Sequence, residues 1–215
     1  MPIINRLKKR EYQEIALFQD TIIDILYNID DQVILHGGTT VWRCFGGSRF
    51  SNDIDAYLNK NIGLNEFKKQ MSLASAKQGI KLEKIKDTGN IIFMGFLYGN
   101  TYIKVELNHI SKIPTFIPTR FERSDGTFID VLSLTPNSLI LEKIAAYNDR
   151  RFIRDIYDIY ILINYAKIDE ELKTKIKRFV STLQFPVNED DLDNIIYEGP
   201  TPTFNGMVDY ISGKL

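Results

Sequence analysis

The spacing of apolar residues changes character near Pro136. Before this proline, segments with helical spacing are mixed with short apolar or alternating runs, which are typical of strands. The predicted strands are 33–36, 53–58, 80–85, 91–98, 101–110 and 128–134, and the predicted helices are 11–29, 39–44 and 64–78. After the proline the spacing predicts helices over 138–147, 151–165, 170–183 and 189–197. We therefore expect two parts, a mixed α/β half over 1–133 and a helical half over 134–215.

Turn-forming residues separate several of these segments. The pair Gly99-Asn100 predicts a hairpin between two strands. Pro114 and Pro118 predict a loop. No clear period is visible in the last stretch, which contains Gly199, Pro200, Pro202 and Gly206.

Composition excludes several classes of protein. Of the 215 residues, 44% are apolar and 26% are charged, which is ordinary for a globular chain and unlike disordered or collagen-like sequences. A single cysteine, Cys44, rules out an internal disulfide. One cysteine and two histidines are also few ligands for a zinc site, which argues against one. The net charge of −1 means that any nucleic-acid contact needs a local basic patch. There is neither an apolar run near the ~20 residues of a membrane span nor a signal peptide, so we expect a cytoplasmic protein without a membrane partner.

The run Gly37-Gly38-Thr39-Thr40 follows a predicted buried strand. Two glycines between a strand and a helix expose backbone N–H groups at the helix N-terminus, a place that favours phosphate. The two threonines add hydroxyl donors. Alone, the same run also fits an ordinary strand-to-helix turn, and His36 directly before it is interpreted as structural.

Acidic residues then recur at strand spacing. Asp53 and Asp55 are two residues apart, so on a strand both carboxylates lie on one face, where a divalent ion would relieve their repulsion. Glu106 lies in an alternating run and shares a face with Tyr102, Lys104 and Asn108. A solvated strand edge is the alternative for the first pair, and ordinary one-sided burial of a sheet is the alternative for the second run.

The helical half carries a local positive excess. From 143 to 178, nine basic residues stand against six acidic ones, a net charge of +3. If Asn148 or Asp149 caps a new helix, a mixed set of charges shares one of its faces. Cations there could hold a triphosphate, and the alternative is a helix laced with its own ion pairs. The shared face carries Arg151, Arg154, Asp155 and Asp158.

Two segments together resemble a known family. The first runs from Gly37 to Thr40 and on through Arg49-Phe50-Ser51-Asn52-Asp53-Ile54-Asp55, and the second is Arg154-Asp155-Ile156-Tyr157-Asp158 with Lys143 upstream. They are similar to the AbiEii-type nucleotidyltransferases, the toxins of type IV toxin–antitoxin systems, within the superfamily related to DNA polymerase β. The resemblance covers residues from about 31 to 165.

This resemblance implies an α+β fold with a mixed β-sheet nucleotidyltransferase core (1–133), flanking helices and a helical C-terminal domain (134–215). It implies transfer of a nucleotide from an NTP to a hydroxyl of RNA, such as tRNA, or of protein, with Mg²⁺ as cofactor, a two-ion site and a cognate antitoxin as further expectations. The implied metal ligands are Asp53, Asp55 and Glu106. The implied catalytic residues are these three with Lys143 and Asp158. The implied nucleotide-binding residues are Gly37, Gly38, Thr39, Thr40, Arg49, Ser51, Lys143, Arg154 and Asp155.

Two other functions remain open from the sequence. One is a non-catalytic protein that binds a nucleotide or an antitoxin, against which the three intact acids argue. The other is a metal-dependent nuclease, which leaves the Gly-Gly-Thr-Thr run without a role.

Overall fold

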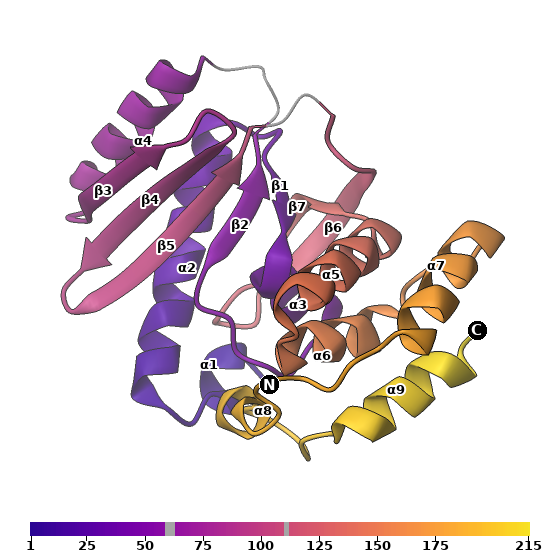
Figure 1. The fold of residues 1–215 in the computed structure, drawn as a ribbon. Coiled ribbons are helices and arrows are strands. Elements are labelled where there is room, and N and C mark those ends of the chain that lie inside the picture. Colours follow the sequence, from indigo (N-terminus) through magenta and orange to yellow (C-terminus); the bar gives the residue numbers. More distant parts are fainter. Residues whose placement is uncertain (59–62, 110–111) are drawn as a thin grey trace.

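The computed structural model describes residues 1–58, 63–109 and 112–215. Within these ranges seven strands form one mixed sheet (Figure 1). The strands are β1 (Ile34–His36), β2 (Ile54–Tyr57), β3 (Lys81–Asp87), β4 (Ile91–Tyr98), β5 (Thr101–Asn108), β6 (Phe116–Glu122) and β7 (Phe128–Leu134). Their order across the sheet is β3-β4-β5-β2-β1-β7-β6. The pairs β2–β5 and β1–β7 are parallel, and the other neighbours are antiparallel.

The helices lie on both faces of this sheet (Figure 1). In the first half of the chain they are α1 (Ile3–Arg6), α2 (Arg10–Ile29), α3 (Gly37–Phe45) and α4 (Leu64–Lys77). In the second half they are α5 (Pro136–Arg150), α6 (Ile153–Leu162), α7 (Glu170–Ser181), α8 (Asp191–Ile195) and α9 (Phe204–Gly213). No helix within the described residues is long and apolar enough to cross a membrane.

Each face of the sheet contributes to its own apolar core. Alternate residues of β4 and β5, such as Met94 and Val105, are buried in one cluster with residues of α2 and α4. The opposite face contributes Ile34 and Leu134 to a second cluster formed mainly by α5, α6, α7 and α9. The C-terminal helices therefore pack on the sheet through a shared core.

The fold confirms the predicted class, a mixed sheet flanked by helices with a helical C-terminal part. The hairpin at Gly99-Asn100 is also present, between β4 and β5. The prediction of strand over 101–110 is confirmed as far as Asn108, and Ile110 lies outside the described residues. The division into domains at 133/134, which falls just before the last residue of β7, stays a prediction.

Three elements were not predicted. The loop expected around Pro114 and Pro118 is in part strand β6, because β6 is the last strand of the sheet and an edge strand tolerates a residue without an N–H. Helix α9 is capped by Thr203, the residue before it, whose side chain accepts a hydrogen bond from the Gly206 N–H. Helix α1 is a single turn that precedes the long α2.

Candidate active site

The glycine pair forms the corner between β1 and α3. Gly37 has φ +73°, in the left-handed region that favours glycine. A β-carbon on Gly37 would overlap the Asp55 carboxylate, and one on Gly38 would overlap the guanidinium of Arg49 and the hydroxyl of Ser51. Glycine is required here because charged and polar side chains approach the backbone closely.

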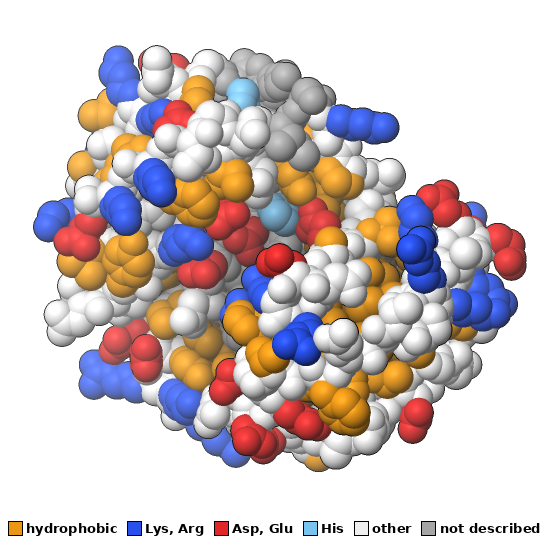
Figure 2. All heavy atoms as spheres, viewed as in Figure 1, with side chains coloured by type: hydrophobic (Ala, Val, Ile, Leu, Met, Phe, Trp, Pro, Cys, Tyr) orange, Lys and Arg blue, Asp and Glu red, His pale blue; other side chains and the backbone are white. Residues whose placement is uncertain are grey.

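The predicted acids come together on the sheet. Asp55 on β2 and Glu106 on β5 are partners in register on parallel strands, so both side chains leave the same face. Asp53 directly precedes β2. All three line a cavity of about 560 Å³, and Figure 2 shows acidic side chains around a hollow near the centre of this face.

Charges around this cavity disturb the titration of Asp53. Partial burial raises the pKa of its carboxyl, and the neighbouring carboxylates of Asp55 and Glu106 add to that rise. Lys104 and Arg154 act in the opposite direction without cancelling it. A negative charge at Asp53 is thus disfavoured unless a further cation approaches.

A buried glutamine holds the loop that leads to Asp53. Gln19 Nε2 on α2 donates to the carbonyl oxygens of Ser51 at 2.8 Å and Asn52 at 3.0 Å. The Thr39 hydroxyl donates to the carbonyl oxygen of Asp53 itself. These bonds fix the backbone at the mouth of the cavity. Gln19 and Thr39 therefore position Asp53 through its backbone and not through its carboxylate.

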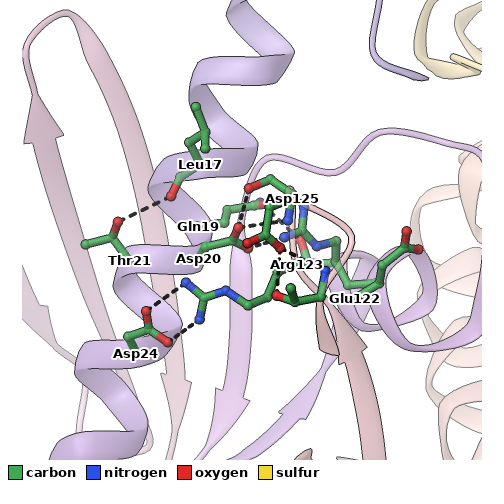
Figure 3. A network of polar contacts seen from close by, with 12 residues as sticks. Leu17, Gln19, Asp20, Thr21, Asp24, Glu122, Arg123 and Asp125 are labelled. Carbon is green, nitrogen blue, oxygen red and sulfur yellow. Dashed lines mark hydrogen bonds and ion pairs between the residues drawn. The ribbon is translucent and has the colours of Figure 1, made fainter. Parts of the chain in front are cut away.

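Helix α2 is itself anchored next to Gln19 (Figure 3). Asp20 accepts hydrogen bonds from buried Arg43 of α3 and from Ser124 at the β6–β7 turn. One turn along, Asp24 accepts two bonds from Arg123, at 2.6 and 2.9 Å. The glutamine therefore stands on a helix that is tied to both α3 and the far end of the sheet.

Two buried aspartates of α6 organise the cations. Asp158 accepts from Arg49 Nε at 2.5 Å and Nη2 at 2.6 Å, and its Oδ2 is 2.7 Å from Lys143 Nζ. Asp155 accepts two bonds from Arg150, at 2.8 and 2.9 Å. Burial alone would raise the pKa of Asp158, but Arg49 and Lys143 outweigh it and the pKa is lowered.

Arg154 differs from these paired cations. It lines the cavity, and no ion pair is formed by its guanidinium within the described residues. Partial burial lowers its pKa, and the nearby Arg150 and Arg49 lower it further. An anion that entered the cavity would relieve this concentration of positive charge.

The predicted site residues thus fall into two groups. Nine line the cavity: Gly37, Gly38, Arg49, Ser51, Asp53, Asp55, Glu106, Lys143 and Arg154. Four are buried beside it and do not line it: Thr39, Thr40, Asp155 and Asp158. Their hydrogen bonds run to the backbone or to the cations, as with the Thr40 hydroxyl, which donates to His36 O at 2.7 Å.

No group of three His, Cys, Asp or Glu side chains within the described ranges is arranged to hold a metal ion by itself. The donor chemistry nevertheless fits Mg²⁺, because this ion usually takes one or two protein carboxylates and completes its shell with water and substrate phosphates. Asp53 and Asp55 supply those carboxylates. The Glu106 carboxylate already has a cation, since its Oε2 is 3.3 Å from Lys104 Nζ.

Sequence reasoning missed a polar network at one end of the cavity. Glu142 of α5 accepts from the Tyr57 hydroxyl at 2.6 Å, and its other oxygen is 3.2 Å from His36 Nδ1. Asn108 Nδ2 is 3.1 Å from His36 Nε2. Burial would raise the pKa of Glu142, but His36 and Tyr57 more than compensate and the pKa is lowered. The strand register offered one signal, because Tyr57 and Asn108 are partners two residues beyond Asp55 and Glu106.

Comparisons with known proteins agree with this geometry. The family model described as nucleotidyl transferase AbiEii toxin, type IV TA system, matches residues 24–209. No match was found among curated proteins.

Among solved structures, JHP933 from Helicobacter pylori is similar with a TM-score of 0.64 and 17% identity, over 93% of this chain and 89% of that one. MenT4, the nucleotidyltransferase toxin Rv2826c from Mycobacterium tuberculosis H37Rv, is similar with a TM-score of 0.63 and 16% identity, over 95% of this chain and 82% of that one. At such identities these likenesses show the fold. The family model, by contrast, spans most of the sequence and includes both acidic strands and the cation-bearing helices. The chain therefore belongs to the AbiEii family of nucleotidyltransferase toxins of type IV toxin–antitoxin systems.

Proposed function

We propose that this nucleotidyltransferase transfers the nucleoside monophosphate of an NTP to an acceptor hydroxyl, on RNA such as tRNA or on a protein, with Mg²⁺ as cofactor. In a toxin–antitoxin system a cognate antitoxin would be its partner. One observation carries the proposal: the acids Asp55 and Glu106, partners in register, face the same cavity as Arg154, which forms no ion pair with any described residue.

The cations and the glycine corner would bind the triphosphate. Arg154 offers a guanidinium that no carboxylate within the described residues neutralises. Lys143 and Arg49 are held at the cavity wall by Asp158, so they are ordered before a ligand arrives. Gly37 and Gly38 begin α3, where backbone N–H groups favour phosphate. The Ser51 hydroxyl would add a further donor.

Asp53 and Asp55 would hold Mg²⁺ together with phosphate oxygens. The bound ion would neutralise charge on the phosphates and on the leaving pyrophosphate. The disfavoured charge of Asp53 supports this assignment, because a divalent cation nearby would stabilise the ionised carboxylate. Asp53 is held for this role by the backbone bonds from Gln19 and Thr39.

Glu106 is the proposed group that receives the acceptor's proton. The acceptor oxygen forms a bond to the α-phosphorus as the bond to the bridging oxygen of pyrophosphate breaks, and the hydroxyl proton passes to the carboxylate. Lys104 Nζ, 3.3 Å from Glu106 Oε2, would hold this carboxylate in place. Asp155 and Asp158 act as positioning residues for Arg150, Arg49 and Lys143.

A labelling experiment tests the proposal. The full chain is incubated with each of four α-³²P-labelled NTPs, Mg²⁺, and either total RNA or total protein. We expect label in one acceptor class with one preferred NTP, and loss of labelling in EDTA and in the double variant Asp53→Asn/Asp55→Asn. Asp193→Asn, an exposed acid of α8, is the matched control and should label normally.

Two results would contradict the proposal. One is unchanged labelling by the double variant. The other is tight NTP binding with no labelled product in either acceptor class, which would favour the non-catalytic binding protein.

A further inference from the structure

Part of the sheet face that carries the acids is not covered by helices. Over β1 and β7 this face is packed against α5 and α6. Over β3, β4 and β5 it carries side chains that are at least partly exposed, and α4 and α2 lie behind these strands (Figure 1). We call this uncovered region the β3–β5 face and define it by Lys84, Lys86, Phe93, Tyr102 and Lys104.

Lysines and aromatic rings alternate across the β3–β5 face. The strand register places Lys86, Phe93 and Glu106 in one row, and Lys84, Gly95 and Lys104 in the next. Gly95 has no side chain, and a β-carbon there would overlap the Tyr102 hydroxyl, so the tyrosine ring lies across β4. Tyr102 is 47% exposed, and Lys104 Nζ lies 5.2 Å from the centre of the Phe93 ring. Figure 2 shows basic and apolar side chains interspersed over these strands.

This face is positively charged, and most of its lysines form no ion pair with a described residue. Neither Lys84 nor Lys86 forms an ion pair within the described ranges, and both are exposed. Lys104 is paired with Glu106 at the cavity edge. The two acids of β3 have other cations, since Glu83 is 3.0 Å from Lys81 and Asp87 is 2.5 Å from Lys68. A polyanion would thus meet two free ammonium groups before it reached the cavity.

This face is continuous with the candidate active site. Lys104 lines both the cavity of about 560 Å³ and a smaller hollow of about 250 Å³ that lies over Lys84, Lys86 and Tyr102. Along β5, Tyr102, Lys104 and Glu106 follow at two-residue intervals on one face, from the hairpin towards the cavity. A chain lying on this face would end beside Glu106.

We propose that the β3–β5 face docks the acceptor as a single-stranded segment of RNA, whose terminal nucleotide enters the cavity past Lys104. Exposed rings between lysines suit this ligand, because bases stack on aromatic side chains while phosphates contact cations. A peptide acceptor would make no comparable use of regularly spaced lysines beside flat rings. The inference rests on the proposed function only in naming this RNA as the acceptor.

Binding is tested without catalysis. The full chain is titrated into a 5′-fluorescein-labelled, twelve-nucleotide RNA of mixed sequence, without NTP or Mg²⁺, and anisotropy is recorded at several salt concentrations. We expect a slope of log K against log[salt] of about −1.4 for contacts by the two lysines without an ion pair, Lys84 and Lys86, and a slope close to zero for Lys84→Ala/Lys86→Ala. Tyr102→Ala should weaken binding about five- to a hundredfold, whereas Tyr102→Phe, which keeps the ring, should bind like wild type.

The control replaces two exposed lysines of α4, on the other side of the same strands. Lys69→Ala/Lys77→Ala removes the same charge and should leave affinity and salt slope unchanged. Equal weakening by this control, or equal binding of a twelve-residue Asp/Glu-rich peptide, would overturn the inference. So would wild-type binding by the Lys84/Lys86 variant.

Transfer assays separate this inference from the proposed function. If both hold, Lys84→Ala/Lys86→Ala raises KM for RNA and leaves KM for NTP unchanged. Binding of RNA at this face with no transfer under any NTP would contradict the proposed function alone. Transfer of label to protein with no RNA binding would overturn this inference alone.

Discussion

Replacing Asp158 with asparagine tests whether this residue has a structural role. The side chain is fully buried and carries the negative charge for Arg49 and Lys143, which are themselves 4% and 8% exposed. Asparagine keeps the shape but removes that charge. The local sum over Arg49, Lys143, Arg150, Asp155 and Asp158 then rises from +1 to +2.

The expected cost follows from the burial of this network. Breaking a buried ion pair by neutralising one partner costs roughly 3–5 kcal/mol, since an uncompensated charge remains in a region of low dielectric. With an m-value of about 3 kcal/mol/M, the midpoint of urea unfolding should fall by about 1–1.7 M. The assay is urea unfolding of the full chain followed by circular dichroism.

The exposed acid Asp193 supplies the control. Asp193→Asn should change stability by less than about 0.5 kcal/mol. An Asp158→Asn protein with wild-type stability would refute the structural role, and loss of transferase activity in that stable protein would favour the direct catalytic role that the sequence resemblance implied.

Three further predictions concern two residues that line the cavity and one that holds the loop beside it. Gly37→Ala should lower stability by at least about 1–2 kcal/mol and abolish transfer, because φ +73° disfavours alanine and the new methyl group overlaps Asp55. The control Gly213→Ala in α9 should not destabilise the protein. Thermal unfolding measures the stability of each variant, and labelling measures its transfer activity. Asp53→Asn should raise the melting temperature at pH 7 while removing activity. The raised pKa of Asp53 makes its charge unfavourable in the folded state, so the gain should shrink as the pH falls through that folded pKa and vanish below the unfolded value near 3.9; an unchanged or lower melting temperature at pH 7 would contradict this. Gln19→Met should cost about 1 kcal/mol and lower kcat, because two partly buried carbonyl oxygens before Asp53 lose their donor. An unchanged kcat would show that the loop is held without this donor.

Strand periodicity was enough to predict the acidic face of the sheet. Alternation in 101–110 placed Glu106 with Lys104 and Asn108, and the structure has them along β5 with Glu106 opposite Asp55. Such local patterns are reliable because side chains of a strand must alternate. The pairing of β2 with β5, which brings the acids together, is a long-range contact that spacing alone does not specify.

The roles of the α6 acids depend on which side chains are buried in the fold, and the sequence does not show this. Periodicity grouped Arg154, Asp155 and Asp158 on one helix face, but burial separates them. Asp155 and Asp158 point into ion pairs with α5 and the loop at Arg49, while Arg154 reaches the cavity. Helical spacing indicates which residues are neighbours, and it does not indicate which of them face solvent.

Features that depend on tertiary contacts could also not be predicted from the sequence. Pro118 argued against a strand. It is tolerated in β6 because this edge strand pairs on one side only, so a missing N–H need not break the sheet. Glu142 gave no local signal, since its partners His36 and Tyr57 come from two strands far away in the chain. Both cases are tertiary constraints that outweigh local preference.

The shared core of the C-terminal helices has a consequence for genetics. Helix α9 buries Phe204, Met207 and Ile211 against a cluster that includes α6, the helix that carries the cation-holding aspartates. A premature stop codon shortly before Phe204 would therefore inactivate the enzyme although every cavity residue is still translated, because α6 would lose the helix that packs against it. Among bacteria selected to survive expression of this toxin, we expect escape alleles to include such late truncations alongside missense changes at the acids.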